Sequence, residues 1–190
     1  ERFFIVFANP VNATMTDPQA IGTITNDDPV PTLSIDDPTV IEGQLGSKNI
    51  TFTVLLSAPS GRNVQFDYAT SDGTALQPGD YTARTGTLTI PAGSISRTIV
   101  IDVIGDTLDE VDETFTVTLS APTNATFSDD TGVGTITDND PTPNVSFQPV
   151  TLIEGNSGTT DMIFTVTLNT ASGQTVTVAY ATANNSADEG

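Results

Sequence analysis

Carboxylates are the side chains of this sequence that could do chemistry, and they gather in a few short segments. From Asp102 to Glu113, six of twelve residues are acidic and none is basic. Other acids stand in Ile41-Glu-Gly43, in Ser71-Asp-Gly73 and in Asp138-Asn-Asp140. Grouped carboxylates serve two kinds of chemistry, which are acid–base catalysis by a pair and the binding of a hard cation such as Ca²⁺ through six to eight oxygens. A third interpretation is that these loops are only solvated surface.

The overall composition narrows these choices. The chain of 190 residues carries 24 acidic and 5 basic residues, a formal charge of −19, which disfavours binding to nucleic acid or to an anionic membrane. It has no Cys and no His, and therefore no thiol nucleophile, disulfide, zinc–thiolate site or imidazole base. No run of about 18 apolar residues predicts insertion into a membrane.

An enzyme is the least favoured class. A catalytic carboxylate pair needs one acid whose pKa is raised by an apolar cleft. The sequence shows no apolar cleft around any acid, and the chain has no Trp and three Tyr with which to line a sugar platform. We therefore expect no catalytic activity.

The elements that must position the acids are short strands. Apolar residues alternate with polar ones along the middle of the chain, as in Phe52, Val54 and Leu56, or in Phe115, Val117 and Leu119. Turn clusters such as Ala58-Pro-Ser-Gly61 separate these runs, and no stretch has a helical apolar stripe. The pattern predicts an all-β fold of tandem immunoglobulin-like antiparallel β-sandwiches, with about seven strands per repeat. Since one loop seldom supplies enough oxygens for Ca²⁺, several loops would have to converge at one end of a sandwich.

The chain repeats itself at a single offset. Motifs that begin at Glu113, Gly134, Ile153 and Phe164 echo those that begin at Glu1, Gly22, Ile41 and Phe52, and every pair is 112 residues apart. The repeat predicts three parts. Residues 1–29 form the C-terminal part of one repeat, 30–141 form a complete repeat, and 142–190 form the N-terminal part of a third.

Proline pairs mark the expected joints, in Asp27-Asp-Pro-Val-Pro31 and Asp138-Asn-Asp-Pro-Thr-Pro143. Proline fixes φ and removes a donor, so these links should be short and stiff. Polymerisation by strand donation is an alternative, but joining the two partial repeats of neighbouring chains would leave positions 79–112 of the repeat empty. A window on a longer array is the better interpretation.

The motifs of the repeat resemble the Calx-beta domain. They include Ile41-Glu-Gly43, Tyr68-Ala-Thr-Ser-Asp-Gly-Thr-Ala75, Gly79-Asp-Tyr81, Glu110-Val-Asp-Glu-Thr-Phe-Thr-Val-Thr-Leu119 and Gly132-Val-Gly-Thr-Ile-Thr-Asp-Asn-Asp140. The resemblance covers the whole repeat in order and extends into both partial repeats. It implies a sandwich that binds Ca²⁺ at one tip, near the junction with the next domain.

The resemblance also implies a ligand set. Carried over by motif, the metal ligands are Glu42, Asp72, Asp106, Glu110, Glu113, Asp138 and Asp140. Asp80 is expected to serve a turn, and Asp109 and Asp112 are expected to be solvated charges. Asn139 stands where the family often has a carboxylate, so we expect fewer ions or weaker binding, in the range of roughly 10⁻⁴–10⁻³ M for extracellular modules.

Two functions follow from the resemblance. We expect a calcium-binding structural or adhesive module of a long extracellular or cell-surface protein, in which calcium stiffens the joints between repeats. The alternative is a calcium-sensing regulatory module of a membrane protein, as in the sodium–calcium exchangers. The expected partners are adjacent repeats of the same protein, lateral or head-to-tail copies in a fibre, and a cell-surface or matrix partner.

Overall fold

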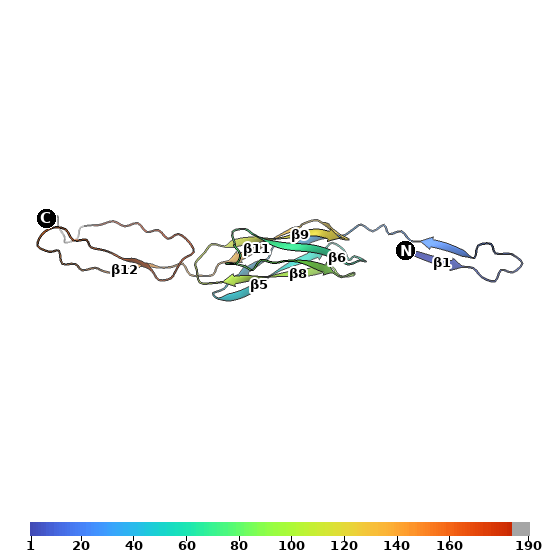
Figure 1. The fold of residues 1–190 in the computed structure, drawn as a ribbon, viewed down its shortest axis with the longest axis horizontal. Helices are drawn as coiled ribbons and strands as arrows, with labels where there is room; N and C mark the ends of the chain where they lie inside the picture. The colour runs from blue at the N-terminus through green and yellow to red at the C-terminus, as the bar shows by residue number, and fades with distance from the viewer. Residues whose placement is uncertain (184–190) are drawn as a thin grey trace. The chain divides into compact units, whose positions relative to one another are not determined.

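The computed structural model describes residues 1–183, and its chain divides into two compact units, Glu1–Val30 and Pro31–Gly190. Each unit is described here by itself. Strands are the only regular elements among residues 1–183, and the prediction of an all-β fold is confirmed. The second unit contains a β-sandwich (Figure 1).

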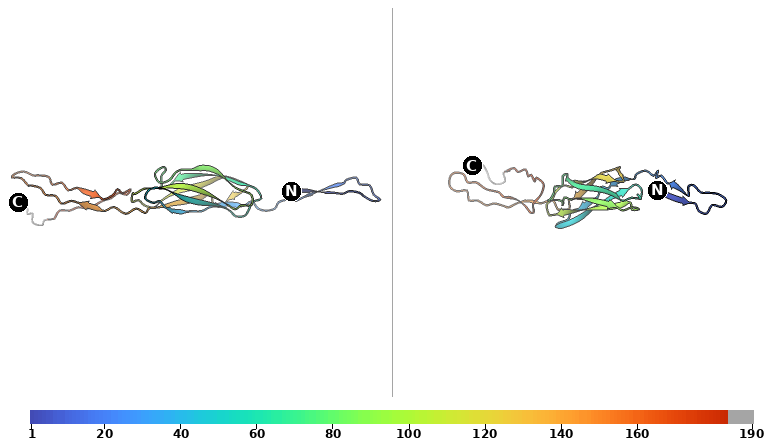
Figure 2. Two further views of the ribbon diagram at one scale, coloured as in Figure 1. Left: turned by 90° about the horizontal axis from the view of Figure 1, so that it is seen from below. Right: turned by 45° about the vertical axis from the view of Figure 1, so that its right-hand side comes forward.

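Two sheets form this sandwich and lie face to face (Figure 2). One sheet has the order β10-β3-β5-β8 and the other the order β4-β11-β9-β6-β7. The strands are β3 (Thr32–Ile35), β4 (Thr39–Ile41), β5 (Gly46–Leu56), β6 (Val64–Asp72), β7 (Thr85–Ile90), β8 (Ser96–Gly105), β9 (Glu113–Thr123), β10 (Thr126–Phe127) and β11 (Thr131–Thr137).

The count of about seven strands agrees with this arrangement. The short strands β3 and β4 follow one another but belong to different sheets, so that one stretch of chain serves both layers. β3 pairs with β5 in antiparallel orientation, and β4 pairs with β11 in parallel orientation. These pairings hold the two short strands in different sheets. When β3 and β4 are counted as one strand and the two-residue β10 is left out, seven main strands remain.

The alternating residues form the core, as the sequence predicts. Phe52, Val54, Phe115 and Val117 are fully buried between the sheets. Phe115 and Phe52 form an edge-to-face pair with 5.9 Å between their ring centroids, and Phe115 also stacks on Tyr81 at 4.3 Å between centroids. Such aromatic pairs add about 0.5–1.5 kcal/mol beyond the burial of their area. Tyr81 thereby holds the segment between β6 and β7 against the core.

A pair of short strands precedes the sandwich in the sequence and another pair follows it, and each has the same register as the corresponding pair in the sandwich. In the first unit, β1 (Arg2–Val6) pairs with β2 (Gln19–Thr23), and Phe3 lies opposite Gly22, as Phe115 lies opposite Gly134 in the pair β9–β11. After the sandwich, β12 (Val145–Phe147) pairs with β13 (Val166–Leu168) in the register of β3 and β5.

Positive backbone φ angles recur at the same offset. They occur at Asn9 and Asn12, which correspond to Ala121 and Asn124, and at Gly155 and Gly158, which correspond to Gly43 and Gly46. The shared registers and angles support the interpretation of the chain as tandem repeats, while the boundaries at 29/30 and 141/142 stay a prediction.

Candidate calcium site

The acids come together because seven strand ends meet at one end of the sandwich. Strands β4, β6, β8 and β11 end there, and β5, β7 and β9 begin there, as their pairings require. The acidic segments named in the sequence analysis lie in the loops at this end or at the strand ends beside them. We call the side chains gathered there the acidic tip: Glu42, Asp80, Asp106, Glu110, Glu113, Asp138 and Asp140.

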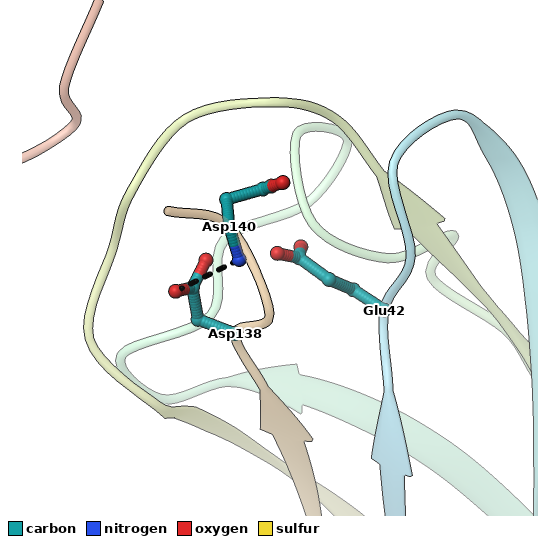
Figure 3. Close-up of side chains that lie close together, drawn as sticks. All are labelled: Glu42, Asp138 and Asp140. Atoms are coloured by element: carbon teal, nitrogen blue, oxygen red, sulfur yellow. Dashed lines mark hydrogen bonds between the residues drawn. The ribbon is translucent and has the colours of Figure 1, made fainter. Parts of the chain in front are cut away.

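The first group of the tip contains Glu42, Asp138 and Asp140 (Figure 3). Each offers a carboxylate oxygen, and these oxygens lie within 4.8 Å of one another. Glu42 is 6% exposed and Asp140 is 8% exposed. One buried oxygen of each side chain (Glu42 Oε1, Asp138 Oδ1 and Asp140 Oδ2) has no hydrogen-bond partner among the described residues. A buried polar atom without a partner costs about 1–3 kcal/mol, and more when it is charged, so this group is incomplete by itself.

Burial and mutual repulsion act on the protonation of this group. Burial, followed by the proximity of Asp138 and the charges of Asp106 and Asp140, raises the pKa of Glu42 to about 8. Burial and the neighbouring carboxylates, first of all Asp138, also raise the pKa of Asp140. A bound cation would reverse these effects, because it favours the charged form of every carboxylate around it.

The second group contains Asp80, Glu110 and Glu113, again with oxygens within 4.8 Å of one another. Burial and then the charge of Asp80 raise the pKa of Glu113 to about 7. Burial raises the pKa of Glu110, and the charges of Asp106, of Asp80 and of the first group raise it further. The two groups therefore belong to one connected field of negative charge.

Two of the expected ligands lie outside both groups. Asp106 is exposed and accepts a hydrogen bond from the Leu108 amide at 2.8 Å, but its charge acts on both groups. Asp72 accepts hydrogen bonds on Oδ1 from the Tyr81 hydroxyl at 2.6 Å and from the Gln77 amide at 3.2 Å. The structure thus places Asp72 as a support for the loop after β6. The other five, Glu42, Glu110, Glu113, Asp138 and Asp140, lie in the two groups.

Backbone contacts hold the first group in place. The backbone N–H of Gly43 donates to Asn139 Oδ1 at 3.0 Å. The Asn139 side chain, which stands where the family often has a carboxylate, thus connects the loop after β4 to the loop after β11. The Gln44 amide group donates to Asp140 Oδ1. The end of β8 approaches closely, since a Cβ on Gly105 would lie 2.0 Å from the Gly43 carbonyl oxygen. Only glycine fits at this contact between the two sheets.

Sequence reasoning misjudged two acids, of which Asp80 belongs to the tip and Asp109 does not. Asp80 accepts from the Leu76 amide at 2.7 Å, as expected of a turn residue, but it also belongs to the second group. Asp109 was expected to be solvated and is 8% exposed. Thr142, Ser172 and Gln174, which come much later in the chain, contact its carboxylate. No local sequence pattern predicts these contacts. Asp112 is exposed as expected, and its Oδ1 accepts from the Asp138 amide.

The donor set of the tip fits a hard divalent cation. All of its side-chain ligands are oxygens, and they come from separate loops. Three of these oxygens have no hydrogen-bond partner in the part of the chain that the structure describes, as expected where an ion completes the coordination. The sequence has no His and no Cys, so neither an imidazole nor a thiolate is available as a metal ligand.

The family model of the Calx-beta domain matches residues 26–142 and again residues 138–190. The chain belongs to the Calx-beta family. The two matched segments meet at residues 138–142, which form the second expected joint. A search of curated protein sequences gave no significant match.

Solved structures of Calx domains are similar to this Calx-beta chain. The apo form of the Calx CBD1 domain is 25% identical with a TM-score of 0.53, and the match covers 59% of this chain and all of that domain. CBD12 from CALX1.2 is 25% identical with a TM-score of 0.52, and the calcium-binding domain CBD12 of CALX1.1 is 26% identical with a TM-score of 0.51. The match covers 57% of this chain in both cases, but only 46% and 44% of those two structures.

Family membership determines the broad class of function. Calx-beta domains are calcium-binding modules of regulatory or binding proteins rather than catalytic domains. Within residues 1–183, the structure has no helix that is long and apolar enough to cross a membrane.

Proposed function

We propose that this chain binds Ca²⁺ at its acidic tip and works as a structural module of a repeat array. The single observation that carries the proposal is the first group, where the three carboxylates offer oxygens within 4.8 Å of one another and each has a buried oxygen without a hydrogen-bond partner among residues 1–183. We assign Glu42, Asp138 and Asp140 to one ion and Glu110 and Glu113, joined by Asp80, to a second position. Asp106 lies near enough to contribute charge to both.

The second group links the tip to the following segment. Gly173, in the loop after β13, lies so near Glu110 that an added Cβ would be 2.4 Å from Oε1. A cation at the tip would supply positive charge that fixes the Glu110 carboxylate. Because Glu110 packs against Gly173, its ordering would restrict the joint at residues 138–143.

This geometry supports an array in which calcium stiffens the joints. Without the ion, the like charges of the tip repel one another and favour open loops. With the ion, bending the joint costs coordination. We propose that the array is extracellular and structural or adhesive, without catalytic activity, and that its nearest partners are adjacent repeats of the same protein. Self-association into fibres and a cell-surface or matrix ligand are further proposals of the same kind.

A calcium-sensing regulatory module of a membrane protein is the second candidate. The similarity to the Calx CBD domains favours it, because Calx-beta domains are calcium-binding modules of exchangers. The two candidates share the ion site and differ in what the domains are attached to. The sequence of the full protein separates them, since membrane spans next to the repeats would favour regulation and many further repeats would favour an array.

Calorimetry and small-angle scattering on the 190-residue chain test the proposal. We expect calcium to bind with a dissociation constant of roughly 10⁻⁴–10⁻³ M, and we expect the maximum dimension of the chain to be better defined and larger with calcium than with chelator. Magnesium at the same concentration is the control, because its preference for a small octahedral site suits this tip poorly. No heat of calcium binding would reject the site, and an unchanged scattering profile would reject the stiffening.

A further inference from the structure

Asp109 is a buried acid that the calcium site does not use. Although it lies in the most acidic loop of the chain, it belongs to neither group of the tip and is 8% exposed. Thr142 donates to its Oδ1 at 3.2 Å, and Ser172 and Gln174 approach its Oδ2 at 3.4 Å. Its carbonyl oxygen accepts from the Gly173 amide at 3.1 Å. Every oxygen of Asp109 thus accepts from residues of the joint or of the segment that follows it.

The contact has the form of a short parallel bridge with added side-chain bonds. Asp109 and Ser172 pair as an isolated parallel bridge, and the Ser172 hydroxyl also reaches the Asp109 carbonyl oxygen at 3.4 Å. Several of these bonds are long, and each one alone is weak. Their strength comes from convergence on a single buried carboxylate, which would be costly to leave without partners.

The loop that contacts Asp109 occurs in both repeats. Ser172-Gly173-Gln174 corresponds to Ser60-Gly61-Arg62 at the offset of 112. In both loops the amide of the third residue donates to the hydroxyl of the first, at 3.1 Å in each case. The middle repeat carries this loop between β5 and β6, at the end of the sandwich opposite the acidic tip. A conformation that recurs in both repeats is a property of the loop itself and does not depend on its contact with Asp109.

We propose that Asp109 is a docking residue that joins each repeat to the next by binding a preformed Ser-Gly-Arg/Gln loop at the base of the following repeat. The contact works without calcium, since all of its donors and acceptors belong to the chain. It goes beyond the proposed stiffening by calcium. The third position of the loop sets its strength, because arginine there would give Asp109 a charge-assisted partner where Gln174 gives a neutral one.

Hydrogen exchange of the Gly173 amide in the full 190-residue chain, measured by NMR without calcium, tests the docking. Asp109→Ala should speed this exchange about three- to tenfold, as expected for the loss of hydrogen bonds to a carboxylate. Asp161→Ala, at an exposed acid of the third part, is the charge-matched control and should leave the rate unchanged. Gln174→Arg should slow the exchange, and that slowing should vanish in the double variant with Asp109→Ala.

A distance measurement gives a second readout. The chain has no Cys, so spin labels can be attached through Thr98→Cys and Thr177→Cys, two exposed positions on either side of the joint. Asp109→Ala should broaden the distance distribution in chelator, and Gln174→Arg should narrow it.

The outcomes separate docking from calcium binding. Unchanged exchange and unchanged distances for Asp109→Ala in chelator would overturn the proposal. An effect that appears only with calcium, together with weaker binding in calorimetry, would also overturn it and make Asp109 a ligand. Failure of the chain to bind calcium would reject the proposed function and leave the docking contact standing.

Discussion

Replacing Glu42 by Gln should have opposite effects with and without calcium. Glu42 is 6% exposed, its Oε1 has no partner within residues 1–183, and its neighbours are the carboxylates of Asp138 and Asp140. Glutamine has nearly the same shape and carries no charge, and its amide group can donate to those carboxylates. The change therefore removes an unfavourable contribution to the folding free energy of the calcium-free protein. In the calcium-bound protein it removes a metal ligand.

The magnitude follows from the raised pKa. Folding moves the pKa of Glu42 from 4.5 to about 8, so the calcium-free protein loses stability as the pH rises from about 4.5 to about 8. At pH 7 the folded chain still holds this proton while the unfolded chain has released it. The cost is at most about 3 kcal/mol at about 1.4 kcal/mol per pKa unit. Glu42→Gln should recover a large part of that amount at pH 7 and almost nothing below pH 4.

Urea unfolding in calcium-free buffer, from pH 4 to pH 9, measures the first effect. Calorimetry at pH 7 measures the second, and we expect the variant to bind calcium at least about tenfold more weakly, since even the loss of a residue that only supports a ligand has that effect. Calcium binding should also release a proton from Glu42. In buffers of different ionisation enthalpy, the variant should release about one proton fewer than the unchanged chain.

Glu154→Gln is the matched control, because Glu154 occupies the same position in the third repeat and is exposed. It should leave the stability of the sandwich unchanged. A calcium-free Glu42→Gln variant that is less stable than the original at pH 7 would refute the reasoning, and so would a pH dependence that the substitution does not alter.

Two further predictions concern the framework of the tip. Asp72→Ala should lower the stability by about 1–3 kcal/mol in urea unfolding, equally with and without calcium, because it leaves the Tyr81 hydroxyl and the Gln77 amide without their acceptor. A loss of calcium affinity as large as that of Glu42→Gln would instead make Asp72 a ligand. Gly105→Ala should cost about 1–3 kcal/mol or more, since its Cβ would lie 2.0 Å from the Gly43 carbonyl oxygen. Gly61→Ala, with open space around the added Cβ, is the control and should stay within about 0.5 kcal/mol of the original, and equal melting temperatures for the two variants would contradict the close approach.

Much of the fold could be read from the sequence because its signals are local. Alternation along Phe52–Leu56 and Phe115–Leu119 predicts half-buried strands, and those apolar side chains form the core. The offset of 112 predicts that hairpins recur, and the registers of β1–β2 and β12–β13 agree with it. The division of one stretch between two sheets, as β3 and β4, was not predictable in this way, because either short strand would pair equally well on local grounds.

The acidic tip was also predicted only in part from the sequence. The sequence by itself determined which loops are acidic and, through the Calx-beta motifs, which acids to expect at an ion. Only the tertiary structure decided that Asp80 joins Glu110 and Glu113, that Asp72 supports Tyr81, and that Asp109 is buried. The physical reason is distance along the chain. A carboxylate's role depends on which donors and charges surround it, and those around Asp109 come from residues up to 65 positions away.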